Sequence, residues 1–570
     1  MDLHSVIPII ILIAAVLLLA LAFGKYMAAV YQEKQTWLNF LKPVESWICR
    51  FCGINPKQQM DWKQYTLALI AINLIWWLMS FLLLVFQAHL PLNPAGNPSM
   101  SWDLAFNSSV SFLTSTDLQH YSGESGATYF TQISVFTFLQ FVSAATSLAA
   151  GVAIVRGFAK KSSQSIGNFF QDLLLSVTRV LLPLCILAAV LLLFCGVPMN
   201  FNRPETITTL QGEQVTVANG PVAAMLPIKE LGSNGGGFFG ANDAHPFENP
   251  NISSFIIHVV MVLLLPASFL FFVGFYLDEK KLAQMVIGIM LIGLVMLTIP
   301  IMLGEIYGNP AQQKLGINIS HGNMEGKEVR LGSTLSSFYA GLNIVVPAGT
   351  TVSAHDSYMP LAGIYMLLGM QIDAFFGGVG SGWINMLIFL IIAVFIGSLM
   401  IGRTPELFGR KVTLRQIQAA MIVFLFQPLV CLGLTGLAIS VFQYIFHGNN
   451  GLNWFGNNGP HNFTTALYEF TSSYSGNGSN FASLGNNTVF WNLTTAFAML
   501  CGRFIPIFGG LYIAGLMRHQ IYTPASAGTL KTDTASFGVL LFFVIVVLQS
   551  LSMFSCFVLG PINEHLHLIH

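Results

Sequence analysis

The residues of this sequence best suited to chemistry form one glycine-rich stretch, Gly232-Ser233-Asn234-Gly235-Gly236-Gly237. Glycine lacks a side chain, so its backbone turns freely and an ion or a second backbone can come close to it. The stretch lies between apolar segments of membrane length, where irregular backbone is tolerated only if protein buries it or water reaches it. We therefore expect these residues to line part of an ion path.

Three other stretches repeat this design, in which a half-length apolar segment ends in small and polar residues. Four such re-entrant loops around one axis would bring together four sets of backbone carbonyls, which replace the water shell of the ion in a potassium filter. The carbonyl ends of the half-helices would also favour a cation. The alternative is four ordinary polar loops at the outer surface. The half-helices and the polar ends that follow them are Trp102–Leu113 with Thr114–Asp117, Pro221–Leu231 with Gly232–Gly237, Leu335–Val346 with Pro347–Thr351, and Asn462–Phe470 with Thr471–Phe481.

The composition is that of a membrane protein. Of the 570 residues, 54% are hydrophobic and only 8% are charged, whereas soluble domains carry roughly 25% charged residues. The net charge is zero, which gives no electrostatic support for nucleic-acid binding. We expect an all-α polytopic protein in contact with membrane lipid, because several apolar stretches reach the roughly 20 residues that a span needs. The ten stretches lie near 5–29, 65–88, 127–155, 170–197, 254–277, 283–304, 382–401, 418–446, 489–515 and 536–560.

The positive charges predict an orientation. No Lys or Arg precedes the uninterrupted apolar run Ile7–Phe23, and Lys25, just after that run, is the first positive charge of the chain. An N-terminus outside would place most Lys and Arg in the inside loops, as the positive-inside rule requires. The C-terminus would then also lie outside. The inside loops of this topology are 30–63, 156–167, 278–282, 402–416 and 516–534.

The third of the four repeats is interrupted by glycine. Gly377, Gly378, Gly380 and Gly382 lie between two apolar runs, and glycine favours unwinding of a helix. Interrupted helices often mark ion sites or gates in transporters, so we expect a gate or hinge here, with simple helix packing as the alternative. The chain is thereby divided into a first span and inside loop (1–63), repeat one (64–167), repeat two (168–282), repeat three (283–416), repeat four (417–518), and a last inside loop and span (519–570).

Three ionisable residues in apolar surroundings are candidates for roles near the path. Arg503 lies near the middle of the ninth stretch, and a central arginine usually faces a cavity or a partner because its insertion costs about 2.5–3.5 kcal/mol. It could oppose straight passage of a cation or pair structurally with a carboxylate or carbonyls. Glu230 and Glu469 occupy matching positions at the ends of half-helices. They could hold the loops by hydrogen bonds or attract cations to the mouth.

The sequence contains no recognisable ATP site. A phosphate-binding loop with its lysine and an Asp-Lys-Thr-Gly motif are both absent, so the energy for transport must come from an ion gradient or a partner. Cys49 and Cys52 form the one CxxC motif, too few ligands for zinc. His258 has no second histidine at haem-ligand spacing. This argues against the rival interpretation of an electron-transfer subunit that binds haem or quinone.

Several strings resemble the KdpA family, the potassium-binding subunit of the bacterial potassium-transporting Kdp ATPase. These strings stand in the order expected of the family and cover nearly the whole chain. The resemblance implies a ten-span protein with four channel-like repeats, related in fold to potassium channels and symporters. The matching strings are Tyr121–Ser125, Asn234–Phe239, Ala244–Pro250, Met370–Ile372, Phe376–Gly382 and Ile401–Glu406.

The resemblance also implies a K⁺ filter built from backbone carbonyls. Gly235, Gly349 and Gly478 match the filter glycines of loops two to four, and loop one has Thr114-Ser115-Thr116 at this position. Gly476 competes with Gly478, so the register of the fourth loop stays open. The expected filter residues are Thr114, Ser115, Thr116, Asn234, Gly235, Gly236, Ala348, Gly349, Thr350, Asn477 and Gly478, with Gln119, Glu230 and Glu469 as supports at the mouth.

The same resemblance implies an energy source outside this chain. A P-type ATPase subunit would carry the phosphate chemistry, with two small Kdp subunits completing a four-subunit complex in the bacterial inner membrane. This chain would bind K⁺ but no ATP, and would pass K⁺ sideways through an intersubunit tunnel to the ATPase subunit. The rival within the same superfamily is a gradient-driven potassium symporter or channel that needs no ATPase.

Overall fold

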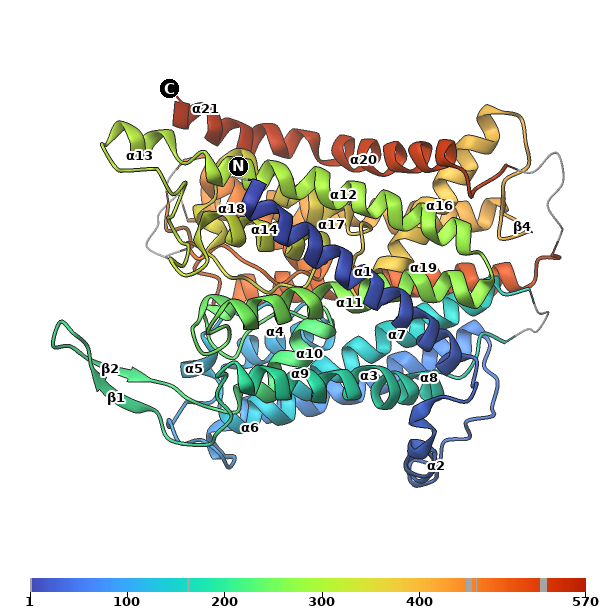
Figure 1. The fold of residues 1–570 in the computed structure, drawn as a ribbon, viewed down its shortest axis with the longest axis horizontal. Helices are drawn as coiled ribbons and strands as arrows, with labels where there is room; N and C mark the ends of the chain where they lie inside the picture. The colour runs from blue at the N-terminus through green and yellow to red at the C-terminus, as the bar shows by residue number, and fades with distance from the viewer. Residues whose placement is uncertain (1–2, 161–164, 447–453, 458, 523–529, 570) are drawn as a thin grey trace.

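The computed structural model describes residues 3–160, 165–446, 454–457, 459–522 and 530–569 as a bundle of long helices (Figure 1). Within these residues, ten helical segments are long and apolar enough to cross a membrane, which confirms the ten predicted spans. Their main helices are α1 (Leu3–Tyr31), α3 (Trp62–Val85), α7 (Phe138–Phe158), α9 (Leu182–Phe194), α11 (Ile252–Leu277), α12 (Lys280–Ile306), α16 (Ser381–Met400), α17 (Leu414–Ser440), α19 (Val489–Arg518) and α20 (Ala535–Phe557).

Polar capping residues fix where several spans begin. The Asp61 side chain accepts a hydrogen bond from the backbone N–H of Gln64 at 2.8 Å, and the Gln64 side chain accepts one from the backbone N–H of Asp61 at 3.2 Å. Asn251 and Ser254 form the same reciprocal pair at the start of α11. Such pairs satisfy N–H groups that have no partner inside the helix. The start of each of these spans is therefore set locally by the sequence.

Four short helices lie between consecutive spans, one in each repeat. They are α4 (Trp102–Leu113), α10 (Val222–Leu231), α14 (Gly332–Val345) and α18 (His461–Ser475), and nearly all of their residues are buried. In sequence they lie between α3 and α7, α9 and α11, α12 and α15 (Pro360–Ile372), and α17 and α19. The predicted order of span, half-helix, loop and span is thus confirmed in all four repeats. Outside the repeats, α1 packs along α11, and α20 packs against α15 and α16.

The fourth half-helix is longer than the sequence pattern indicated. We expected it to end at Phe470, but α18 continues to Ser475. The prediction was wrong because it followed the general preference of Ser and Thr for turns and caps, whereas Ser473 lies within the helix and its Oγ donates to the carbonyl of Glu469 at 2.7 Å. Gly476, with φ of +70°, then ends the helix in the left-handed conformation that glycine adopts most readily.

The third repeat is broken where its glycines predicted an interruption. Helix α15 ends at Ile372 and α16 begins at Ser381. Between them the backbone turns repeatedly, with positive φ at Asp373, Phe376, Gly377 and Gly380. The second half of this repeat is therefore two helices joined by an irregular segment inside the bundle.

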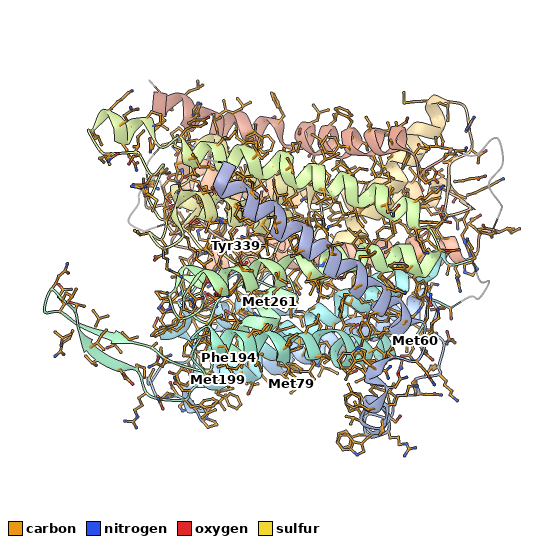
Figure 2. The ribbon with its side chains drawn as sticks, in the orientation of Figure 1. Met60, Met79, Phe194, Met199, Met261 and Tyr339 are labelled. Carbon is orange, nitrogen blue, oxygen red and sulfur yellow. The ribbon has the colours of Figure 1, made fainter. Side chains whose placement is uncertain are left out.

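Burial distinguishes the inner spans from the outer ones. Most residues of α7, α11 and α16 are buried, whereas few residues of α1 and α3 are. Tyr339 and Met261 are almost fully buried between helices, while Phe194 at the end of α9 is exposed (Figure 2). The loops that follow the half-helices are thus enclosed by protein.

The two ends of the bundle carry different connections. The hairpin of β1 (Glu205–Thr208) and β2 (Gln214–Val217) projects from the end toward which both termini lie, and β3 (Glu406–Leu407) with β4 (Arg410–Lys411) lies at the other (Figure 1). Parts of two predicted inside loops lie outside the described residues: Lys161 and its neighbours in 156–167, and a portion of 516–534. The remaining short helices are α2 (Lys42–Phe51), α5 (Gly123–Gly126), α6 (Tyr129–Thr131), α8 (Phe169–Leu175), α13 (Pro310–Lys314) and α21 (Asn563–Ile569).

Candidate functional site

The loops after the four half-helices contact one another in a closed ring. A side chain on Gly235 would place its Cβ 2.5 Å from the carbonyl oxygen of Ala348. A side chain on Gly349 would overlap the carbonyl oxygen of Asn477, and one on Gly478 would overlap that of Thr116. These contacts join loop two to three, three to four, and four to one. All three glycines have positive φ, so both the backbone turn and the close approach require glycine.

The ring is closed between loops one and two by Gly236. Its added Cβ would lie 3.0 Å from the carbonyl oxygen of Asp117. In loop four, Gly478 contacts the backbone of loop one, whereas a Cβ on Gly476 would lie 3.9 Å from its nearest neighbour, Thr116 Oγ1. Gly476 ends α18. The contact with loop one is therefore made by Gly478.

Loop one makes its turn without glycine. Ser115 has φ of +57° and Asp117 has φ of +50°, and short polar side chains tolerate this conformation by bonding locally. Ser115 Oγ lies 2.9 Å from Ser143 Oγ and 2.8 Å from Asn234 Oδ1, within hydrogen-bond distance of both. The hydroxyls of Thr114 and Thr116 lie 3.0 Å apart. Hydrogen bonds thus hold the turn of loop one, whereas glycine permits the turn in the other three loops.

Side-chain amides hold the loops from outside the ring. Asn234 Nδ2 donates to the carbonyl of Ile228 at 3.0 Å, and Asn477 Nδ2 donates to that of Asn343 at 3.0 Å. Gln119 makes two bonds to the backbone of Gly237, at 2.9 Å and 3.0 Å, and so joins loop one to loop two. The two asparagines therefore face the half-helices, and their backbone remains the part that can face the ring.

A wide cavity lies on one side of the ring and a narrow one on the other. The first has a volume of about 420 Å³ and is lined by Gly236, Gly349 and Gly478 together with loop one. The second has about 30 Å³ and is lined by Thr114, Ser115 and Thr116 with the broken segment of repeat three. A water needs roughly 10–15 Å³ by this measure. The narrow cavity therefore holds very few waters.

Arg503 on α19 lies beside the narrow cavity. It donates to the carbonyl of Ser143 at 2.7 Å and to Ser115 Oγ at 3.4 Å, and it lines the cavity with Asp373. The guanidinium is thus placed immediately behind loop one and bonded to a carbonyl, one of the arrangements expected from the sequence. Its side chain therefore borders the narrow cavity on the side of loop one.

Asp373 is a residue of this region that the sequence analysis did not identify. Its carboxylate accepts from Asn385 Nδ2 at 2.8 Å, and it lines both the narrow cavity and a neighbouring one of about 40 Å³. The neighbouring cavity is also lined by Gln427 and Gln549. The signal available in the sequence was a carboxylate shortly before the glycines of the interruption, with Ala374, Phe375 and Phe376 between them.

The four glycines of the broken segment have two different surroundings. A Cβ on Gly380 would overlap the carbonyl of Ser147 on α7, and Cβ atoms on Gly377 and Gly382 would overlap each other's backbone or that of Phe376. These three glycines serve close packing. Gly378 lines the narrow cavity instead, and is the one of the four whose backbone borders the candidate path.

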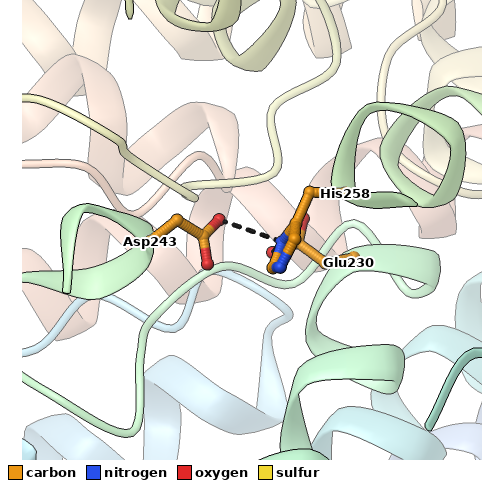
Figure 3. A group of neighbouring side chains, drawn as sticks. All are labelled: Glu230, Asp243 and His258. Carbon is orange, nitrogen blue, oxygen red and sulfur yellow. Dashed lines mark hydrogen bonds and ion pairs between the residues drawn. The ribbon is translucent and has the colours of Figure 1, made fainter. Parts of the chain in front are cut away.

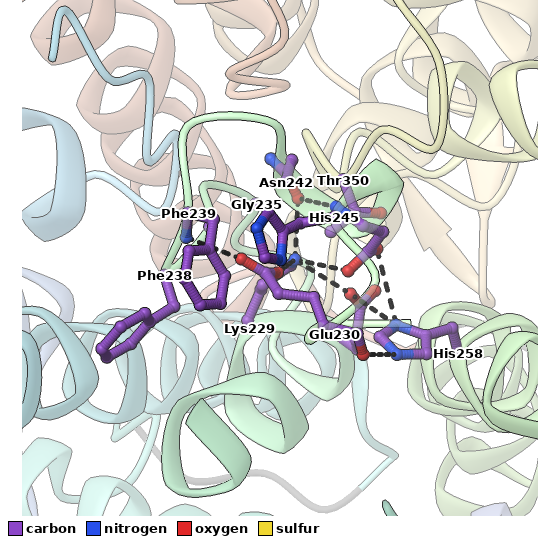
Figure 4. A network of polar contacts seen from close by, with 12 residues as sticks. Lys229, Glu230, Gly235, Phe238, Phe239, Asn242, His245, His258 and Thr350 are labelled. Atoms are coloured by element: carbon purple, nitrogen blue, oxygen red, sulfur yellow. Dashed lines mark hydrogen bonds and ion pairs between the residues drawn. The ribbon is translucent and has the colours of Figure 1, made fainter. Parts of the chain in front are cut away.

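A buried ionic cluster lies behind loop two. Lys229 Nζ donates to Asn242 Oδ1 at 2.7 Å, to Asp243 Oδ1 at 2.7 Å and to Glu248 Oε2 at 2.6 Å (Figure 4). Glu230 Oε1 lies 3.1 Å from His258 Nδ1. Burial alone would raise the pKa of Asp243, but Lys229 and His258 outweigh burial and hold this pKa well below its ordinary value. The cluster ties the half-helix α10 to the chain that returns from loop two.

Glu230, Asp243 and His258 lie close enough to hold a metal ion (Figure 3). Their geometry has another explanation, because the ammonium of Lys229 lies 3.6 Å from Glu230 Oε1 and already bonds Asp243. A cation of the protein therefore occupies the place that a metal would take. The group fits an internal ion-pair network better than a metal centre.

Glu469 occupies the corresponding place in repeat four. Its Oε1 lies 3.0 Å from His120 Nε2 and accepts from Asn486 Nδ2 at 3.2 Å. Like Glu230, it is fully buried. Both carboxylates have the surroundings of residues that hold the loops, and neither is exposed at the mouth of the wide cavity.

These features define a class of protein: a multi-pass membrane protein in which four repeats of span, half-helix, loop and span bring their loops together in one ring. The fold is similar to the crystal structure of the potassium transporter TrkH from Vibrio parahaemolyticus, with a TM-score of 0.51 and 17% sequence identity, covering 87% of this chain and 96% of that one. The likeness shows a shared fold.

The sequence comparisons are more specific. The model of the potassium-transporting ATPase A subunit family matches residues 10–566, so the chain belongs to this family. Proteins named potassium-transporting ATPase potassium-binding subunit are similar along nearly their full length. The one from Flavobacterium johnsoniae is 46% identical with 99% of both chains covered, and that from Bacteroides thetaiotaomicron is 44% identical with 99% of this chain and 100% of the other covered. The relative from Alicyclobacillus acidocaldarius is 41% identical with both chains fully covered.

Proposed function

We propose that this chain is the potassium-selective, non-hydrolytic subunit of an ATP-driven K⁺ uptake pump. It binds K⁺ from outside in a filter of backbone carbonyls and passes the ion to a P-type ATPase subunit. The observation that carries the proposal is the closed ring in which Gly235, Gly349 and Gly478 each touch the backbone of the next loop. Family membership and the names of the relatives support K⁺ as the ion.

The physical basis of selection is replacement of the ion's water by fixed oxygens. Four half-helices precede the loops, and the negative ends of their dipoles favour a cation there. Carbonyl oxygens of the loops take the place of water ligands. The residues that we assign to the filter are Thr114, Ser115, Thr116, Asn234, Gly235, Gly236, Ala348, Gly349, Thr350, Asn477 and Gly478, with Gln119, Glu230 and Glu469 supporting them.

Beyond the filter we propose a sideways route. Arg503 places a positive charge behind loop one, beside the cavity of about 30 Å³, so a straight path is opposed by charge. The neighbouring cavity beside Asp373 continues toward Gln427 and Gln549. The side-chain oxygens of Asp373, Gln427 and Gln549 attract a cation, whereas the guanidinium of Arg503 repels one. We assign the gate to the segment around Gly378, which borders the narrow cavity.

We infer the partners and the location from the same family membership. The chain would assemble with a P-type ATPase subunit and two small Kdp subunits in the bacterial inner membrane, with both termini in the periplasm. ATP would be bound and hydrolysed by the ATPase subunit. The energy reaches this chain through the partner, since no phosphate-binding motif is present in its sequence.

The decisive experiment is purification of the chain from native membranes in mild detergent, followed by assays of ATP hydrolysis. Co-purification of an ATPase subunit whose activity rises with K⁺ is the expected result. The rival, a gradient-driven potassium transporter, predicts that the purified chain alone passes K⁺ through liposomes at a sustained rate. Sustained flux by the lone chain with no K⁺-stimulated ATPase in the preparation would overturn the proposal.

A further inference from the structure

A carboxylate buried in loop one lacks a cation beside it. Asp117 is fully buried, and its Oδ2 accepts from Gln140 Nε2 at 2.6 Å. Its other oxygen, Oδ1, has no hydrogen-bond partner in the described part of the chain. None of the ion pairs among the described residues includes it. The group therefore retains capacity to bind a positive charge.

This carboxylate belongs to the wall of the ring. Asp117 lines the wide cavity together with Gly236, Gly349 and Gly478, one glycine from each of the other loops. Gln140 Nε2 lies 2.6 Å from Asp117 Oδ2 and also 3.3 Å from the carbonyl oxygen of Gly235. The side-chain amide of Gln140 thus contacts both the Asp117 carboxylate and a backbone oxygen of loop two. Oxygen atoms of both kinds are the ligands that hard cations prefer.

The turn at this position does not explain the charge. Asp117 has φ of +50°, and asparagine adopts this conformation as readily as aspartate does. Asparagine could also accept the hydrogen bond from Gln140. A buried charge without a partner is costly, and the buried carboxylates of Glu230 and Glu469 each lie beside a histidine. A negative charge at residue 117 is therefore best explained by reversible binding of a cation.

We propose that the Asp117 carboxylate is a cation-binding group of the filter, which contacts K⁺ where the ion passes from the wide cavity into the ring and thereby raises the affinity for K⁺. Gln140 is a positioning residue that holds one carboxylate oxygen and leaves the other for the ion. The inference rests on the proposed function of the four loops as a K⁺ filter, and adds a fixed negative charge to walls otherwise made of neutral carbonyls.

The test is D117N in the purified complex, measured by K⁺-stimulated ATP hydrolysis. The variant keeps the acceptor for Gln140 and the backbone turn but loses the charge. We expect the K⁺ concentration for half-maximal activity to rise at least about tenfold, since a charge at contact distance is worth that much or more even at an effective dielectric constant near 20. The maximal rate should stay close to that of the unaltered complex, because the groups beyond the ring are unchanged.

Thermal unfolding supplies an independent readout. Removing an unpaired buried charge should not lower Tm in K⁺-free buffer, while the rise in Tm that K⁺ produces should shrink. The control is D103N, which neutralises a buried carboxylate that accepts from Asn492 Nδ2 at 2.8 Å and lines neither cavity of the ring. D103N should leave the half-maximal K⁺ concentration unchanged.

The outcomes separate this inference from the proposed function. An unchanged half-maximal K⁺ concentration in D117N, in a complex that K⁺ still stimulates, overturns the role of Asp117 alone. Absence of K⁺ stimulation in the unaltered complex overturns the proposed function instead. If D117N fails to assemble, D117G replaces it, because glycine adopts the same positive φ. D117G should show the same loss of affinity, and normal affinity in that variant contradicts the inference.

Discussion

The hydroxyl of Tyr339 lies 3.0 Å from Thr350 Oγ1, joining the third half-helix to the loop that follows it. The same hydroxyl lies 3.1 Å from Asp243 Oδ2, a member of the ionic cluster behind loop two. One tyrosine therefore links the supports of two neighbouring loops. Because Tyr339 is almost fully buried, water cannot replace these bonds if they are lost.

The first prediction concerns Y339F, which removes the link without changing the ring. We expect the free energy of unfolding to fall by about 1–2 kcal/mol, as for other buried hydrogen bonds, and the discrimination between K⁺ and Rb⁺ in transport to weaken. The control is Y65F. Tyr65 is equally buried and donates at 2.8 Å to the carbonyl of Ala149, away from the loops. A loss of discrimination in both variants would argue against a specific role for Tyr339.

The second prediction concerns the glycines of the ring. G349A should raise the K⁺ concentration for half-maximal transport by an order of magnitude or more, because its Cβ would overlap the carbonyl oxygen of Asn477 at a positive φ. G363A is the matched control, since a Cβ at this helical glycine meets no atom within 4 Å. Concentration-dependent uptake of K⁺ measures both. Equal uptake by the two variants would mean that Gly349 is not a filter residue.

The third prediction concerns the ionic cluster. K229M leaves Asp243 and Glu248 buried without their cation, and breaking such a group by removing one partner costs about 3–5 kcal/mol. We expect a large fall in Tm in detergent. K160M is the control, because Lys160 forms an exposed pair with Glu279 at 4.0 Å, and exposed pairs contribute little. A normal Tm for K229M would mean that the cluster does not stabilise the fold.

The fourth prediction is a pH dependence of stability near the start of α18. His461 Nε2 lies 2.6 Å from Asp356 Oδ1 and its Nδ1 lies 3.0 Å from Glu564 Oε2. Burial disfavours the charged form of the His461 imidazole, but the hydrogen bonds to these two carboxylates outweigh burial and raise the pKa of His461 from 6.5 to about 9. The folded state thus holds the proton more tightly than the unfolded state does.

It follows that the stabilisation is complete below about pH 6.5 and is lost as the pH rises through about 9. Tm measured across this window should fall in the unaltered protein. In H461Q the same window should be flatter and the Tm at pH 6 lower. Identical pH profiles for the two proteins would rule out His461 as the group responsible.

Local sequence patterns determined the plan of this protein. The lengths of the apolar stretches predicted all ten spans, and small and polar residues after half-length segments predicted the four re-entrant loops, because both features depend on neighbours in the chain. The glycines before Ser381 predicted the break in repeat three for the same reason. The end of the fourth half-helix was misplaced at Phe470, because Ser and Thr in general favour turns and caps, whereas Ser473 bonds to the carbonyl of Glu469 within α18.

Only the tertiary structure decided how the loops meet. The contact of Gly478 rather than Gly476 with Thr116, the bond from Arg503 to the carbonyl of Ser143 and the unpaired oxygen of Asp117 all depend on segments far apart in sequence. A glycine pattern indicates that another backbone segment can approach closely, but it does not indicate which segment does. The partner of a buried charge is likewise set by packing, because each repeat supplies only one wall of the ring.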